Sequence, residues 1–267
     1  MYTKIGSRHG QRHQADAESA QDPQDDAQTR VRRRYRASRA VIVPVYNEER
    51  TVDTLLRRLR DGPFPDKEVI VEDDGSRDAT PAILEPWAGV PGFVFLRHDR
   101  NQGKGAAIRT GLAFARGEIT IIQDADLEYA PADFPRLIEL IRQGEAEVVY
   151  GTRYHGPCRA PPALRFRLAV RILNLLVRLL YGQRLTDEAT CYKAFRTSLL
   201  RRWDVRATGF DFCPEVTAKV CRLGYPTVEV PISYRPRTAV EGKKIGWRDG
   251  VQAVWTLLKY RLCFRAD

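Results

Sequence analysis

The sequence predicts an α/β fold with a mostly parallel central sheet and helices on both faces. Short apolar runs alternate regularly with helical segments between residues 40 and 154. The run Ile119–Ile122 is short and apolar, which is typical of a buried parallel strand. Acidic segments follow the first, second and fourth run, and in such sheets these loops share the carboxyl edge where ligands bind.

Five strands are expected in this first part, at residues 40–45, 68–72, 93–97, 119–122 and 147–150. The first helix is indicated by Val52, Leu55, Leu56 and Leu59, which recur at helical spacing. Further helices are expected at 80–87, from Gly103 to Ala115, and at 133–142. Right-handed crossovers would place these helices on both faces of the sheet.

The second part is less regular. We expect helices at 164–180 and 214–223, strands at 190–196 and 227–234, a polar loop at 235–247, and an amphipathic helix at 249–263. Residues 1–38 are rich in Gln, Asp, Arg and Ala without an apolar period, and we expect them to be disordered.

Composition narrows the possible partners. The 267 residues carry a net charge of +10, which suggests nucleic acid, an acidic membrane surface or a phosphorylated substrate. The five cysteines form no C-x-x-C pair and are read as reduced thiols of a cytosolic protein. No secretory signal and no apolar stretch long enough to span a bilayer is apparent.

The most informative stretch is residues 117–129, G-E-I-T-I-I-Q-D-A-D-L-E-Y. Asp124 and Asp126 flank the small Ala125 at the end of a predicted strand, so both carboxylates leave the strand on one side. Carboxylate oxygens that leave room for water and phosphate suit Mg²⁺ or Mn²⁺. The alternative is a solvated acidic turn.

Other polar residues are expected at the same edge. Glu48 and Asp74 can accept hydrogen bonds from a base or a ribose, whereas Asp73 is read as a turn cap. Gly103-Lys104-Gly105 opens a helix, where it either binds an anion or forms a tight loop.

Five motifs occur in the order found in family 2 glycosyltransferases: V-P-V-Y-N-E-E at 43–49, E-D-D-G-S-R-D-A-T at 72–80, N-Q-G-K-G-A-A at 101–107, Q-D-A-D-L at 123–127 and Y-G-T-R-Y at 150–154. The sequence most resembles the dolichyl-phosphate mannose synthases and bacterial polyprenyl-phosphate glycosyltransferases. T-D-E-A-T-C-Y-K-A-F-R at 186–196 and E-V-P-I-S-Y-R-P-R-T at 229–238 extend the resemblance, which covers roughly residues 40 to 262.

The resemblance implies a GT-A fold and a role for individual residues. It places the donor nucleotide on Pro44, Tyr46, Glu48 and Asp74, and its diphosphate and metal on Asp124, Ala125 and Asp126. Arg153, Arg237 and Lys243 would contact donor or acceptor phosphates. The cationic loop at 235–247 would then close over the donor as a lid.

Two acidic residues are weaker candidates near the acceptor. Asp187 could act in catalysis or merely cap a turn, and Glu215 could merely occupy the first turn of a helix. A phosphate acceptor is largely dianionic at neutral pH and needs little help from a base. Glu72 stands where the family usually has an apolar strand residue, and the sequence offers no explanation for it.

We therefore expect a metal-dependent, inverting glycosyltransferase, with Asp126, Arg153 and Asp187 in catalytic roles. The domains would be a disordered extension at 1–38, a catalytic domain at 39–234, and a lid loop with a C-terminal helix at 235–267. The donor would be GDP-mannose, or alternatively UDP-glucose, and the acceptor a polyprenyl or dolichyl phosphate. A soluble saccharide or protein acceptor is the alternative.

The expected location is cytoplasmic, peripheral at the inner face of the membrane. Leucines and arginines of 164–180, together with leucines, aromatic and basic residues of 249–263, would attach the protein to anionic lipid. The alternative is that leucines at this spacing belong to the core. A non-catalytic nucleic-acid binder is disfavoured, because the acidic strand ends would repel a polyanion.

Overall fold

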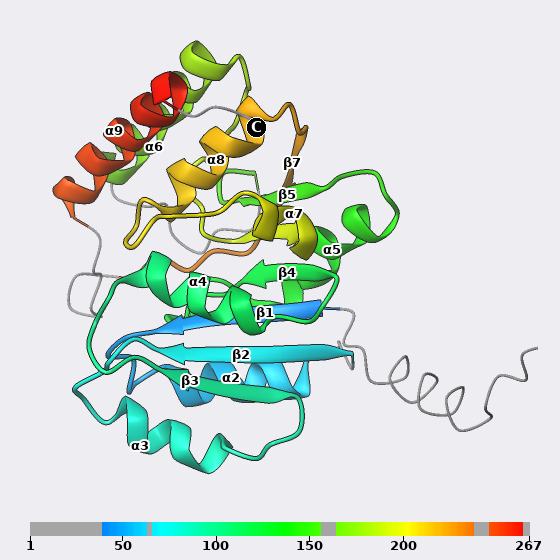
Figure 1. Cartoon of the computed structure of the whole chain (residues 1–267), viewed down its shortest axis with the longest axis vertical. Helices are drawn as coiled ribbons and strands as arrows, with labels where there is room; N and C mark the ends of the chain where they lie inside the picture. The colour runs from blue at the N-terminus through cyan, green and yellow to red at the C-terminus, as the bar shows by residue number, and fades with distance from the viewer. Residues whose placement is uncertain (1–38, 63–65, 156–163, 238–245, 264–267) are drawn as a thin grey trace, which may run out of the picture. The chain divides into compact units, whose positions relative to one another are not determined.

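The computed structural model describes residues 39–62, 66–155, 164–237 and 246–263 (Figure 1). The predicted N-terminal extension, Lys243 and most of the predicted lid loop lie outside these residues.

The core of the fold is a seven-stranded sheet with the order β3-β2-β1-β4-β6-β5-β7. Strand β1 (Arg39–Val45) lies between β2 (Lys67–Asp73) and β4 (Ile119–Ile122), and β3 (Phe93–Arg97) follows at one edge. Beyond β4 come β6 (Lys193–Arg196), β5 (Val148–Thr152) and β7 (Thr227–Pro231). All pairs are parallel except those of β6, which confirms the mostly parallel sheet.

Helices cover both faces, as the alternation of elements predicts. One face carries α2 (Val52–Asp61), α3 (Thr80–Leu84) with the 3₁₀ turn η1 (Glu85–Trp87), and α5 (Phe134–Arg142) after the turn η2 (Pro131–Asp133). The other face carries α4 (Lys104–Phe114), α6 (Leu164–Tyr181), α7 (Thr197–Arg202), α8 (Phe212–Arg222) and α9 (Trp247–Cys263).

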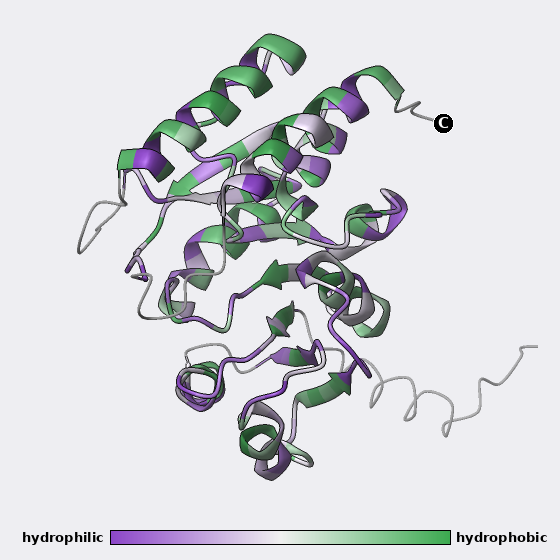
Figure 2. Cartoon of the chain, turned by 90° about the vertical axis from the view of Figure 1, so that its left-hand side faces the viewer, coloured by the Kyte–Doolittle hydropathy of each residue, from purple (hydrophilic) through white to green (hydrophobic). Residues whose placement is uncertain are grey.

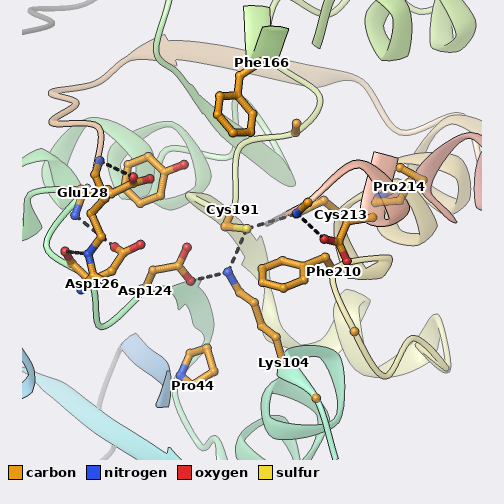
Figure 3. A pocket seen from close by; sticks show the side chains of 18 of the residues that line it. Pro44, Lys104, Asp124, Asp126, Glu128, Phe166, Cys191, Phe210, Cys213 and Pro214 are labelled. Carbon is orange, nitrogen blue, oxygen red and sulfur yellow. Dashed lines mark hydrogen bonds and ion pairs between the residues drawn. The ribbon is translucent and has the colours of Figure 1, made fainter. Parts of the chain in front are cut away.

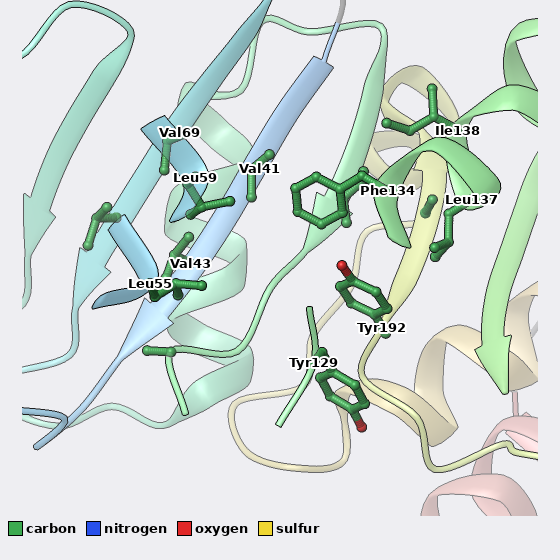
Figure 4. Close-up of a cluster of buried hydrophobic side chains, with 14 of the residues drawn as sticks. Val41, Val43, Leu55, Leu59, Val69, Tyr129, Phe134, Leu137, Ile138 and Tyr192 are labelled. Atoms are coloured by element: carbon green, nitrogen blue, oxygen red, sulfur yellow. The ribbon is translucent and has the colours of Figure 1, made fainter. Parts of the chain in front are cut away.

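The side-chain alternation of β1 builds a core on each face. Val41 and Val43 pack with leucines of α2, such as Leu55 and Leu59, whereas Ile42 faces the other core (Figure 4). Fully burying one such side chain stabilises the fold by about 1.5–3 kcal/mol. These two cores hold the strand ends in fixed positions at the carboxyl edge.

Some element boundaries differ from the sequence prediction. The predicted helix 80–87 changes to a 3₁₀ turn after Leu84, because Pro86 has no backbone N–H for an α-helical hydrogen bond. The predicted strands 190–196 and 227–234 are shorter, and helix α7 was not predicted. Among the described residues, no helix combines the length and the apolar character that a membrane crossing requires.

Candidate functional site

The carboxyl ends of β1, β2 and β4 open into a cavity of about 550 Å³ (Figure 3). One end of the cavity is charged and is lined by Glu48, Asp74, Lys104, Asp124, Asp126, Glu128, Arg153 and Arg237. The predicted donor residues Pro44, Tyr46 and Ala125 line it as well. The structure therefore brings together all the predicted site residues that it describes, except Asp187.

Asp126, the second residue of the predicted metal-binding pair, begins a tight turn. Its Oδ1 accepts a hydrogen bond of 3.0 Å from the backbone N–H of Glu128. Leu127 between them has a φ of +61°, a left-handed conformation that costs a non-glycine residue of the order of 1 kcal/mol. Burial, together with the charges of Asp124 and Glu128, raises the pKa of Asp126 to about 7.

This acidic segment suits a divalent cation. Carboxylates that raise one another's pKa are stabilised by a cation, and hard oxygen donors are the ligands that Mg²⁺ and Mn²⁺ prefer. Within the described ranges, no group of three or more acidic, histidine or cysteine side chains is arranged to hold a metal. Asp124 and Asp126 would therefore share the ion with other oxygen ligands.

Lys104 neutralises Asp124 from the first turn of α4. Its Nζ lies 2.5 Å from Asp124 Oδ1 and 3.0 Å from the Sγ of Cys191. A Cβ on Gly103 or Gly105 would approach the backbone of Thr208 or Ala207 within 2.6 Å. The glycines are therefore required by close packing at the start of α4, which supports the tight-loop interpretation of this segment.

Arg237 connects the loops that follow β1 and β4. Its guanidinium lies 3.1 and 2.6 Å from the two carboxylate oxygens of Glu48, and its Nε donates to the backbone carbonyl of Asp126 over 2.9 Å. Its backbone N–H donates to Glu128 Oε1. Two residues that were predicted to bind the donor are thus paired with each other here, and Glu128 is an additional residue of this site.

Asp74 holds the loop that leads into α4. It accepts hydrogen bonds of 2.8 Å from the backbone N–H groups of Gln102 and Gly103, and its Oδ1 lies 2.7 Å from Nδ1 of His98. The Nε2 of His98 lies 3.3 Å from Oε1 of the fully buried Glu72. Glu72, which the sequence leaves unexplained, is thus the far end of a chain of polar contacts behind Asp74.

Asp187 is not among the residues that line the cavity, and its catalytic role stays a prediction. It is fully buried, and its two oxygens lie 2.7 and 2.6 Å from Nε and Nη2 of Arg153. It also accepts a hydrogen bond of 3.0 Å from the Arg153 backbone N–H. Such a two-pronged contact holds the guanidinium of Arg153 in one orientation. Glu215 likewise serves the fold, since it accepts backbone N–H groups of Arg206 and Ala207.

The other end of the cavity is apolar, and sequence reasoning missed it. It is formed where α6, α8 and α9 approach one another, and its lining includes Phe166, Val170, Leu173, Pro214 and Ala253. Glu188 also lines the cavity: it is fully buried, and neither carboxylate oxygen has a hydrogen-bond partner of ordinary geometry. Burial raises its pKa, against the opposing effects of Lys193 and Thr217.

Helices α6 and α9 also carry large apolar side chains that are exposed. Hydrophobic residues recur along both helices in Figure 2. We call this set the apolar face; it consists of Leu164, Leu168, Ile172, Leu175 and Leu179 of α6 and Trp247, Val251, Trp255 and Leu262 of α9. Of the side chains predicted for membrane contact, Leu168, Leu175, Leu179 and Trp255 belong to this face. Leu257 does not, because it is fully buried in the core.

Comparison with known proteins identifies the family. The pattern of Glycosyl transferase family 2 matches residues 40–203. An undecaprenyl-phosphate mannosyltransferase of Micrococcus luteus is 32% identical over 83% of this chain and 97% of its own length. A polyprenol monophosphomannose synthase of Mycolicibacterium smegmatis is 31% identical over 77% and 80%.

A solved structure supports the fold. The glucosyl-3-phosphoglycerate synthase of Mycobacterium tuberculosis, in complex with Mn²⁺, UDP-glucose and phosphoglyceric acid, matches with a TM-score of 0.64. The match covers 84% of this chain and 80% of that one, at 22% identity. The resemblance seen in the sequence and the expected GT-A fold are thus confirmed, and the chain belongs to glycosyl transferase family 2 as a glycosyltransferase.

Proposed function

We propose that the protein transfers a hexose from a nucleotide sugar to a polyprenyl phosphate. GDP-mannose is the first candidate for the donor and UDP-glucose the second. The observation that carries the proposal is a single cavity with a charged end and an apolar end. An acceptor that has a phosphate group and a hydrocarbon chain matches both ends, and the two relatives described above are named for such acceptors.

The charged end supplies the donor site. We assign the nucleotide to Pro44, Tyr46, Glu48 and Asp74, and the diphosphate to Asp124, Ala125 and Asp126 together with Arg237. A diphosphate would compete with Glu48 for the Arg237 guanidinium, because both present oxygen anions to it. The resemblance also assigns Lys243 to the donor.

A divalent cation, Mg²⁺ or Mn²⁺, fits the carboxylates of Asp124 and Asp126. When bound, it would neutralise the negative charge of the departing nucleoside diphosphate. Lys104 compensates the charge of Asp124 in the free protein.

Arg153 would hold the acceptor phosphate. Arg153 is kept in one position at the cavity wall by two contacts. Its guanidinium pairs with Asp187, and its guanidinium carbon lies 5.2 Å from the centroid of the Tyr234 ring. A phosphate oxygen would then attack the anomeric carbon in line with the leaving diphosphate, which inverts the configuration. Because the phosphate is already dianionic, the buried Asp187 is not required as a base.

We further propose that the protein attaches peripherally to the cytoplasmic face of a membrane through the apolar face. Exposed arginines, among them Arg171 and Arg178, accompany the leucines of α6. Each cation near an anionic surface contributes about 1 kcal/mol to attachment. Such attachment would bring the apolar end of the cavity, to which α6 and α9 contribute, close to the lipid acceptor.

A donor screen tests the proposed function. The purified protein is mixed with Mn²⁺, polyprenyl phosphate and one radiolabelled nucleotide sugar at a time, and label is followed into organic solvent. Label from GDP-mannose in the organic phase is the expected result. Label that moves only to a soluble saccharide or a protein would favour the alternative acceptor, and transfer to none would overturn the proposal.

A further inference from the structure

Two cysteines from different elements meet in the wall of the cavity. Cys191 lies just before β6, Cys213 lies in the first turn of α8, and their sulfur atoms are 3.5 Å apart (Figure 3). Both line the cavity, so a small molecule that enters it can reach them. A disulfide requires sulfur atoms about 2.05 Å apart, so the two would have to approach by about 1.5 Å.

The two thiols are chemically unequal. Lys104 Nζ lies 3.0 Å from the sulfur of Cys191. The hydrogen bond with Cys213 and the charge of Lys104 lower the pKa of Cys191, against the effects of burial and of the Asp124 charge. The same hydrogen bond, together with burial, raises the pKa of Cys213. Cys191 is therefore the sulfur that reacts as a thiolate, and Cys213 is the sulfur positioned to resolve the product.

The simpler interpretation treats both residues as small apolar groups that fill the core. The contact with Lys104 speaks against it for Cys191, because a lysine ammonium beside a sulfur atom is the surrounding that stabilises a thiolate. Cys221 shows the contrasting case on the same helix: burial raises its pKa to about 12, and the charge of Lys193 offsets this only in part.

We propose that Cys191 and Cys213 form a thiol modification site, a dithiol that a peroxide converts into a disulfide. The Cys191 thiolate attacks one peroxide oxygen, the O–O bond breaks, and a sulfenic acid and hydroxide result. The Cys213 thiol then attacks the sulfenic sulfur, the S–S bond forms, and its proton leaves with the displaced hydroxyl as water. Two thiols are oxidised, one peroxide is reduced, and a dithiol reductant reverses the change.

Oxidation would alter the cavity itself. The disulfide ties the first turn of α8 to the segment before β6, and both form the cavity wall. Lys104 loses its thiolate partner and keeps its contact with Asp124. We expect the rate of sugar transfer to fall at least ten-fold. This effect rests on the proposed function, whereas formation of the disulfide does not depend on it.

Peptide mapping tests the site on the full chain. Trypsin places each cysteine on its own peptide, with Cys191 in residues 185–193 and Cys213 in residues 207–219. The reduced protein is treated with increasing hydrogen peroxide, free thiols are alkylated, and the digest is analysed without reduction. We expect a linked pair of these two peptides, lighter by two hydrogens, while the circular dichroism spectrum keeps its native form.

Variants separate this chemistry from general oxidation. In Cys213→Ser, Cys191 should stop at the sulfenic acid and be captured by dimedone. Cys221→Ser, on the same helix, should form the linked pair as wild type does. Lys104→Met should slow oxidation of Cys191 by about ten-fold, since it removes the neighbouring cation.

Two results would overturn the proposal. One is that Cys191 and Cys213 stay reduced while the exposed Cys263 is oxidised. The other is that the linked pair appears only after the native spectrum is lost. If no donor supports transfer, the peptide map still shows whether the disulfide between Cys191 and Cys213 forms. Failure of the proposed function and failure of this site can therefore be told apart.

Discussion

Asp126 is a half-buried carboxylate in an acidic segment, and loss of solvent, followed by the charges of Asp124 and Glu128, raises its pKa. Lys104 compensates Asp124 and Arg237 compensates Glu48, but Asp126 retains a pKa of about 7. At pH 8 the Asp126 carboxylate is charged, which costs free energy, and a bound cation would reduce that cost.

Asp126→Asn should therefore abolish divalent-dependent transfer without unfolding the protein. We expect roughly a 100-fold loss or more, since one ligand of the ion is removed. The Tm at pH 8 should not fall, because the substitution removes an unfavourable charge. Turnover with Mn²⁺ close to that of wild type would refute the assignment of the metal site.

Asp187 and Arg153 give a prediction about positioning rather than proton transfer. In Asp187→Asn the guanidinium loses its anionic partner, and removing one side of a buried ion pair typically costs about 3–5 kcal/mol. We expect a lower Tm and weaker acceptor use, with a pH–rate profile of unchanged shape. A general base would instead show itself through loss of the acidic limb of the profile.

Glu72 gives a prediction about pH and stability. Burial raises its pKa from 4.5 to about 7, against the effect of His98 and with the help of Asp74 and Asp73. An acid whose pKa is higher in the folded state destabilises the fold above that pKa, and the cost disappears as pH falls towards 4.5.

Glu72→Gln should therefore raise the Tm at pH 8, by about 2–4 °C for each kcal/mol gained. The gain should shrink steadily between pH 7 and pH 4.5. Glu85→Gln, at an exposed position, is the matched control and should show no such trend. A lower Tm of Glu72→Gln at pH 8 would contradict the raised pKa.

Among the elements, helices α6 and α9 combine two functions. Their inner sides join the core through Leu173, Val177 and Leu257, while their outer sides form the apolar face. Large leucine and tryptophan side chains that are exposed together lower the solubility of a protein unless a binding partner covers them. Basic side chains beside it favour an anionic membrane as that surface.

Flotation with liposomes that contain anionic lipid tests this face. Wild type should float at low salt and less at high salt, and Arg171→Glu/Arg178→Glu should float less than wild type. Arg57→Glu/Arg58→Glu changes the charge equally on α2, on the opposite side of the sheet, and should float as wild type does. Equal flotation of both double variants, or no flotation of wild type, would remove this face as the membrane contact.

Apolar periodicity predicted the principal helices and strands well, since their side chains face the core at regular spacing. It could not show that β6 runs antiparallel, because a four-residue strand with the sequence K-A-F-R carries no sign of direction. It also missed α7, whose six residues are too short for a period to appear. The end of α3 at Leu84 could have been predicted, because Pro86 follows two residues later.

For the whole molecule, the sequence predicted which strand ends would form the charged end of the cavity. It could not predict that Lys104 would meet both Asp124 and Cys191, which is 87 positions away in the chain. Such contacts depend on how α4, β4 and the segment before β6 pack together. The apolar end was hidden for the same reason, since its lining comes from three helices whose leucines look like ordinary core residues.

The central claim is that one cavity takes a nucleotide sugar at its charged end and a lipid phosphate at its apolar end. Ala169 of α6 lines the apolar end and is exposed, so Ala169→Trp can narrow it without disturbing the core. The decisive experiment measures two quantities for this variant. One is the kinetics of sugar transfer to polyprenyl phosphate, and the other is the affinity for the nucleoside diphosphate in the presence of Mn²⁺. We predict at least a ten-fold rise in KM for the lipid with unchanged nucleotide affinity. Unchanged lipid kinetics, or an equal loss of nucleotide binding, would contradict the account.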